Sequence, residues 1–261
     1  MAMVRSPAVA GLFYPAEIQQ LQHDVRQLLA HAKFPDIKPK ALIVPHAGYI
    51  YSGAIAATAY ACLNPIATRI RRVVLLGPAH RVAVQGLALP NVDVFATPLG
   101  SVRLDTDLIK EIAHLPQVMV SDEAHTLEHS LEVQLPFLQS VLGEFALLPL
   151  AVGMTSAEAV AEVLDHVWGG EETLIVISSD LSHYLPYTTA QRMDTGTVQS
   201  ILQLKLPIEQ AQACGNIPIN GLMLAAQKHH LKPRLLDLRN SGDTAGSRDH
   251  VVGYAAIAFS C

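Results

Sequence analysis

Three histidines in this 261-residue chain each follow a short run of apolar residues. His46 follows the run at 41–44, His80 the run at 72–76, and His183 the run at 173–177. Wholly apolar runs bounded by glycine, proline or polar residues are typical of strands buried on both faces of a parallel sheet. The carboxyl ends of such strands share one edge, where open α/β sheets keep their ligands. We therefore expect the three imidazoles to face one crevice.

His46 and His80 are candidate metal ligands. A helical segment separates their strands, and a right-handed crossover places both strand ends at the same edge of the sheet. Neutral imidazole binds iron, zinc, copper and nickel, but a third ligand is needed. Cys214 lies in a turn before a helical segment, where a helix N-terminus lowers a thiol pKa toward the thiolate. The alternative for each histidine is an ordinary hydrogen-bonded side chain at a strand end.

A second group of ionisable residues lies at 125–132, with the sequence HTLEHSLE. On a helix, His125, Glu128, His129 and Glu132 stand at i, i+3, i+4 and i+7 and line one stripe. This pattern predicts a helix that faces a site or is exposed and charged. The same letters match H-x-x-E-H, the inverted zinc-peptidase motif. A zinc metallopeptidase acting through His125, Glu128 and His129 is therefore one functional alternative.

The third group is Ser179, Asp180 and His183. An aspartate three residues before a histidine can orient the imidazole and raise its basicity, which suits a general base or a proton shuttle. A serine nucleophile is not indicated, because the sequence lacks G-x-S-x-G at a strand-to-helix turn. The structural alternative is a polar turn in which Asp180 caps a helix.

Apolar strands alternate with amphipathic helical segments along the whole chain. Helical spacing covers 16–32, 105–115, 156–168, 188–204 and 217–230, and further strands are expected at 146–152, 234–238 and 251–259. This order predicts an α/β fold, a three-layer sandwich whose central sheet is mixed, mostly parallel and flanked by helices, with antiparallel pairing at its edge. We expect a single domain over residues 1–261, because no repeat or linker interrupts the pattern.

Composition excludes several classes of partner. The net charge is -5 and the 18 Lys and Arg residues are scattered, so neither nucleic acid nor an anionic membrane surface is an expected partner. No apolar run is long enough to span a membrane, and the first residues lack the apolar core of a signal peptide. We therefore expect a cytoplasmic protein. The three cysteines are too widely spaced for a disulfide framework.

Six segments in order along the chain resemble those of the Memo family. They are PHAGYIYSG at 45–53, LGPAH at 76–80, EHSLEVQLP at 128–136, SSDLSH at 178–183, CGNIP at 214–218 and VGYAA at 252–256. Members of that family share the fold of the class III extradiol ring-cleaving dioxygenases, so the resemblance implies an extradiol dioxygenase-like fold for this chain.

The resemblance also implies roles for particular residues. His46, His80 and Cys214 take the positions of the family's metal ligands, with iron (Fe²⁺) as the expected metal and copper or zinc as alternatives. The same pocket is lined by the candidate catalytic residues His183, Asp180, His129 and Glu128. Tyr51 lies at the pocket wall, and Phe13 stands where the eukaryotic members carry a tryptophan.

These residues lead to a primary functional hypothesis and an alternative. The first is a metal-dependent, iron-containing oxidoreductase or dioxygenase-like protein of undetermined substrate. A thiolate replaces the carboxylate of ring-cleaving relatives, so ring cleavage does not carry over with the fold. The alternative is a non-catalytic protein that uses the pocket to bind a peptide or another partner. Expected partners are a small molecule or a peptide, and the family implies a functional link to a radical-SAM protein.

Overall fold

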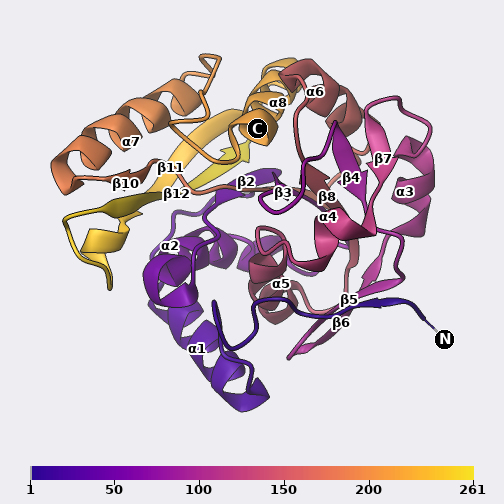
Figure 1. The fold of residues 1–261 in the computed structure, drawn as a ribbon, viewed down its shortest axis with the longest axis horizontal. Helices are drawn as coiled ribbons and strands as arrows, with labels where there is room; N and C mark the ends of the chain where they lie inside the picture. The colour runs from indigo at the N-terminus through magenta and orange to yellow at the C-terminus, as the bar shows by residue number, and fades with distance from the viewer. Residues whose placement is uncertain (1) are drawn as a thin grey trace.

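Twelve strands form one mixed sheet in the computed structural model, which describes residues 2–261 (Figure 1). The strand order along the main path is β1-β5-β6-β8-β3-β9-β2-β12-β10. Its centre consists of four parallel strands: β2 (Ala41–Val44), β9 (Thr173–Ser178), β3 (Arg72–Pro78) and β8 (Ala146–Val152). These are the apolar runs singled out in the sequence, and the predicted parallel core is confirmed.

Antiparallel strands extend the sheet on one side of this core. There β12 (Val251–Ser260) pairs with β2, β11 (Lys232–Asn240) and β10 (His183–Leu185). On the other side lie the remaining strands, β1 (Val4–Arg5), β4 (Leu87–Leu89), β5 (Val94–Thr97), β6 (Gly100–Leu104) and β7 (Val118–Val120). The short 3-10 helices are η1 (Asn64–Ile66), η2 (Glu132–Gln134) and η3 (Ser241–Asp243).

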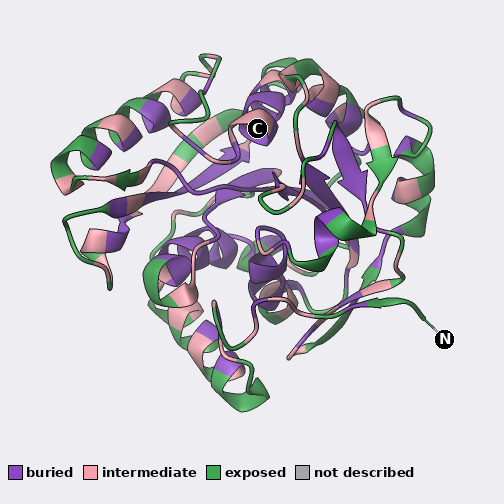
Figure 2. Cartoon of the chain, in the orientation of Figure 1, coloured by how far each residue is buried: buried purple, intermediate pink, exposed green. Residues whose placement is uncertain are grey.

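Helices cover both faces of the sheet and complete the predicted three layers (Figure 1). One face carries α1 (Ile18–His31), α2 (Tyr49–Ala61) and α5 (Leu135–Leu142), and the other carries α3 (Thr106–Ile112), α6 (Ala157–His166), α7 (Tyr187–Leu202) and α8 (Asn216–Lys228). Alternate residues of one strand enter the two cores: Leu42 packs toward α1 and α2, and Ile43 packs toward α8. Figure 2 shows the buried strands between helices with exposed outer faces.

The central strands end level with one another. Val44 is in register with Ser178, and Leu76 with Ile177. The residues that follow β2, β3 and β9 therefore emerge at one edge, as predicted. However, β2 and β3 are not neighbours, because β9 lies between them. The end of β9 therefore lies between the end of β2, which carries His46, and the end of β3, which carries His80. No helix among residues 2–261 is long and apolar enough to cross a membrane.

The N-terminal segment is attached to the loop at 125–132 by a buried ionic network. Arg5 forms an ion pair with Glu132, and both side chains are almost fully buried. Arg5 also donates from Nε to the carbonyl of His125 (3.0 Å) and from a terminal nitrogen to the carbonyl of Glu128 (2.6 Å). The Glu132 carboxylate accepts further bonds from the backbone N–H groups of Ala8 and Val9 and from a tyrosine hydroxyl. Every lone-pair direction of this buried carboxylate is used.

Replacing Glu132 by glutamine should destabilise the fold by about 3–5 kcal/mol, because Arg5 then remains buried without its counter-ion. Urea unfolding of the wild type and of Glu132→Gln would measure this. A double variant, Arg5→Met with Glu132→Leu, should lose less than the sum of its two single changes. A loss below about 1 kcal/mol in Glu132→Gln would show that the pair is not effectively buried.

Candidate metal centre

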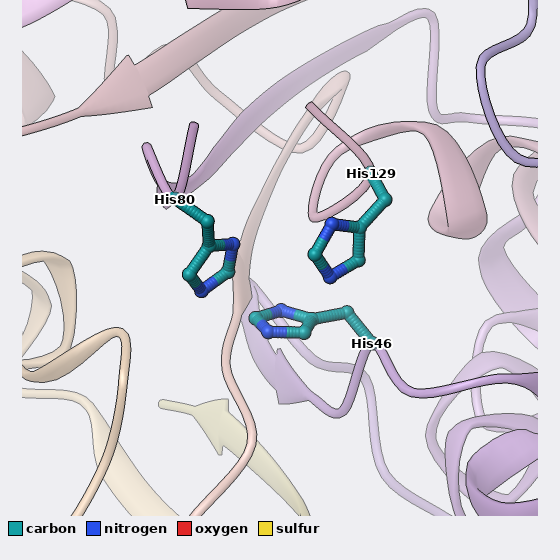
Figure 3. Close-up of side chains that lie close together, drawn as sticks. All are labelled: His46, His80 and His129. Atoms are coloured by element: carbon teal, nitrogen blue, oxygen red, sulfur yellow. The ribbon is translucent and has the colours of Figure 1, made fainter. Parts of the chain in front are cut away.

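Three imidazole rings converge at the carboxyl edge of the sheet (Figure 3). One ring nitrogen from each of His46, His80 and His129 lies within 4.8 Å of the other two. The rings of His80 and His129 stack with centroids 5.0 Å apart, and the His46 ring stands nearly perpendicular to both. The predicted meeting of His46 and His80 is confirmed. His129, expected as a catalytic residue, occupies the third position of the cluster.

His46 follows β2 after a single proline and is anchored by groups at the end of β9. Its backbone N–H donates to Oδ1 of Asp180 (2.8 Å), and its ring Nδ1 lies 3.0 Å from the hydroxyl of Ser178. The residue is 2% exposed. Burial, and then the neighbouring imidazoles His80 and His129, hold the pKa of His46 well below its usual value. The ring is therefore neutral at neutral pH, the form that binds metals.

His80 is oriented by Glu128. The carboxylate accepts from the backbone N–H of His80 (2.6 Å) and from its Nδ1 (3.0 Å), so Nε2 is left for the cluster. Burial raises the pKa of Glu128, but hydrogen bonds from the ring and backbone of His80 and from the backbone of Ser130 outweigh it and lower that pKa to about 2. Glu128 is thus a fixed negative charge. A carboxylate behind a histidine is the usual outer support of a metal-binding imidazole.

His129 is held between Phe13 and Glu128. The Phe13 ring lies 4.8 Å from the His129 ring, and Nδ1 of His129 is 3.4 Å from a Glu128 oxygen without forming a hydrogen bond. Burial lowers the pKa of His129 to about 4, so this ring is also neutral at neutral pH. The loop that carries it approaches β3 closely because of Gly77, where a Cβ would lie 2.8 Å from the Ser130 hydroxyl.

Cys214 lies beside the cluster, in contact with one of its rings. Its Sγ is 3.3 Å from Nε2 of His46 and 3.8 Å from the Ser179 hydroxyl. Gly215 allows this approach, since a Cβ there would lie 2.6 Å from Ser179. Burial, and then the charge of Asp180, raise the pKa of Cys214 to about 12. The expected lowering of this pKa by the following helix is therefore wrong for the metal-free protein, because burial dominates.

The other predicted site residues also lie at this edge. Asp180 hydrogen-bonds the backbone of His46, and no hydrogen bond joins it to His183 among residues 2–261. Burial raises its pKa to about 7. Burial lowers the pKa of His183, and the nearby His80 adds to this effect. Tyr51 is partly exposed on the first turn of α2. Asp180 thus positions the His46 loop, whereas it was expected to orient His183.

The predicted helix over 125–132 is wrong. Helix α4 spans only Asp122–Thr126, and the chain then runs irregularly to η2. His125 is 1% exposed and points away from the cluster, with Nε2 bonded to the carbonyl of Ala88 (2.8 Å). His125 and His129 therefore do not form the paired ligands of an inverted zinc-peptidase motif. The Glu132 carboxylate also points away from a shared stripe, because it forms the ion pair with Arg5.

Two polar residues behind His46 had no assigned role in the sequence. Ser178 and Gln134 are 0% and 1% exposed, and both belong to the hydrogen-bond network that supports the His46 ring. The role of Ser178 could have been suspected from the sequence, because a serine ends the otherwise apolar strand TLIVIS. The role of Gln134 could not, because its hydrogen bonds are to residues 44 and 89 positions away in the sequence.

Comparisons with known proteins place the chain among relatives of similar length. The family described as "Memo-like protein" matches residues 5–258. A "MEMO1 family protein" of Aquifex aeolicus is 38% identical, with 98% of this chain and 99% of the relative covered. Proteins of the same description from Methanosarcina acetivorans (36% identical; 97% and 98% covered) and Metallosphaera sedula (34%; 99% and 100%) are similar over comparable lengths.

A solved structure shares the fold. The crystal structure of an uncharacterized Escherichia coli K12 protein superimposes with a TM-score of 0.53 at 14% identity, covering 82% of this chain and 98% of the other. At that identity the likeness supports the α/β architecture and says nothing of activity.

The His125→Asn variant should bind metal as the wild type does, because His125 lies outside the cluster. Its stability should depend less on pH. Unfolded His125 takes up a proton near pH 6.5, whereas the folded residue does so only near pH 4. The stability due to neutral His125 is therefore present above about pH 6.5 and lost as the pH falls toward 4. Urea unfolding across this range should give a slope shallower by about one proton in the variant. An unchanged slope would contradict the burial of a neutral His125.

Proposed function

The chain belongs to the Memo-like protein family, and from this premise we propose that it is a metal-dependent oxidoreductase of undetermined substrate. The observation that carries the proposal is the group of three imidazole nitrogens within 4.8 Å of one another. Such a group at a strand edge matches the nitrogen-rich sites that hold iron, copper or zinc. The family resemblance favours iron among these metals.

The donor set fits a metal ion. His46 and His80 each have Nδ1 engaged by an outer group, which leaves Nε2 directed at the cluster. Their Nε2 atoms are two of the ligands in this proposal, and the third is either His129 or Cys214. His129 completes the nitrogen group, whereas Cys214 lies outside that group, 3.3 Å from Nε2 of His46, and would have to lose its proton to bind.

The surrounding residues have separable tasks. Glu128 holds His80 and contributes negative charge, and Asp180 holds the backbone of His46. His183, with a lowered pKa, is the proposed proton acceptor at neutral pH. A redox-active ion at this position would supply one-electron chemistry and an open position for an oxygen-containing ligand.

A second candidate is a non-catalytic binding protein. Three large apolar side chains close in sequence to residues of the site are exposed: Ile50 is 71% exposed, Leu127 63% and Tyr184 74%. Each lies within four residues, along the chain, of a residue of the site. Exposed apolar side chains near a site are typical of recognition surfaces. On this hypothesis the bound partner is a peptide or a small apolar molecule, and the metal has a structural role.

Metal analysis after anaerobic purification tests the first proposal. His46→Ala and His80→Ala should lose the iron or copper that the wild type retains. His125→Asn is the matched control, because it removes an imidazole from the same region without touching the cluster. Only trace metal in the wild type, or equal metal content in His46→Ala, would overturn the proposal.

The third ligand is identified by comparing His129→Gln with Cys214→Ser. If Cys214 binds the metal, Cys214→Ser abolishes the thiolate-to-metal charge-transfer absorption and lowers metal content, whereas His129→Gln leaves both in place. The opposite result assigns His129. Reversible oxidation and reduction of the bound metal, followed by electron paramagnetic resonance, supports the oxidoreductase function. A metal that cannot be cycled without being lost favours the binding protein.

A further inference from the structure

The hydroxyl of Ser178 lies within hydrogen-bond distance of three groups at once. These are the carbonyl of Ser130 (2.5 Å), Nε2 of Gln134 (2.8 Å) and Nδ1 of His46 (3.0 Å). A serine hydroxyl has one proton to donate and two lone pairs that accept. We infer that Ser178 is a positioning residue that fixes His46 in the tautomer protonated at Nδ1, with the lone pair of Nε2 directed at the histidine cluster.

The single proton of Ser178 is committed to Ser130. A backbone carbonyl oxygen only accepts hydrogen bonds, so the proton between these two oxygens belongs to Ser178. The separation of 2.5 Å is at the short end of the range for O–H···O bonds. Ser178 therefore has no proton left to donate to His46.

One lone pair of Ser178 is committed to Gln134. The orientation of the Gln134 amide is fixed independently, because its Nε2 also donates to the carbonyl of Pro45 (2.9 Å) and its Oε1 accepts from the Tyr60 hydroxyl (2.9 Å). A flipped amide would face the Pro45 carbonyl with its own oxygen. The amide nitrogen therefore points at Ser178 and donates to it.

The remaining lone pair of Ser178 can be used only by a donor, and that donor is Nδ1 of His46. A neutral imidazole carries one ring proton, so Nε2 is then unprotonated. Ser178, Ser130 and Gln134 are 0–1% exposed and His46 is 2% exposed, so solvent does not compete for these bonds. The chain of partners runs from Tyr60 in the core through Gln134 and Ser178 to the ring.

The three histidines of the cluster are supported by different groups. His80 donates to a carboxylate, His46 donates to a neutral hydroxyl, and Nδ1 of His129 has no hydrogen-bond partner among residues 2–261. Ser178 is thus the group that holds the proton on Nδ1 of His46. Without this acceptor, the ring proton can move to Nε2. There the N–H group can donate a hydrogen bond to Cys214 Sγ, which lies 3.3 Å away. A proton on Nε2 blocks metal binding.

The experiment compares Ser178→Ala with Ser182→Ala. Both serines are fully buried in the same segment, but the Ser182 hydroxyl forms no hydrogen bond with His46, His80 or His129, so Ser182→Ala is a matched control. In metal-free protein labelled with ¹⁵N-histidine, long-range proton–nitrogen spectra at neutral pH report which nitrogen of His46 carries the proton. The wild type and Ser182→Ala should show the proton on Nδ1. Ser178→Ala should shift it to Nε2, wholly or in part, and Ser178→Thr should restore it.

The consequence for metal binding rests on the proposed function. Ser178→Ala should weaken metal affinity by about 10–100-fold, the usual effect of losing an outer-sphere partner, and Ser182→Ala should leave it unchanged. The spectra and the affinities separate the two proposals. A proton on Nε2 in the wild type, or on Nδ1 in Ser178→Ala, would overturn the inference about Ser178 even if metal binds. The predicted spectra in a protein that binds no metal would uphold the tautomer and overturn the metal proposal.

Discussion

The central strands are buried on both faces, and this constraint decides where polar groups can lie. Strands β2, β9 and β3 contribute almost only apolar side chains to the two cores. A polar or ionisable side chain within them would lose its hydration without finding a partner. Polar and ionisable side chains therefore lie just beyond the ends of these strands. Because the three parallel strands end level with one another, these side chains come close together. The meeting of His46 and His80 is a direct consequence of this arrangement.

Placing so many polar groups together at a buried edge requires that they satisfy one another. Glu128 accepts four bonds, from the ring and backbone of His80 and from the backbones of His129 and Ser130. Asp180 and Ser178 serve His46 in the same way. Because these acceptors come from the end of β9, the turn after it and the loop at 125–132, the orientation of the His46 and His80 rings depends on segments distant in the sequence.

The parts of this structure that depend on local pattern could be predicted from the sequence. The apolar runs indicated the parallel core, the strand-end histidines indicated His46 and His80, and their common edge follows from parallel pairing. The parts set by long-range contacts could not be predicted. Helical spacing predicted one helix through His125 and His129, but the carbonyls of His125 and Glu128 bond to Arg5, so tertiary contacts override local periodicity there. The role of Ser178 depends on Ser130 and Gln134, which no local pattern connects to it.

The link between Arg5 and Glu132 also bears on the order in which the molecule is assembled. The two residues are 127 positions apart, so the N-terminal segment leaves the ribosome long before its binding partner exists. Glu128 and His129 come from the same late segment, and Ser178 and Cys214 later still. The site is therefore completed only after most of the chain has been synthesised. High sequence separation of this kind slows folding, and it means that a nascent chain halted before residue 128 holds His46 and His80 but lacks the groups that orient them.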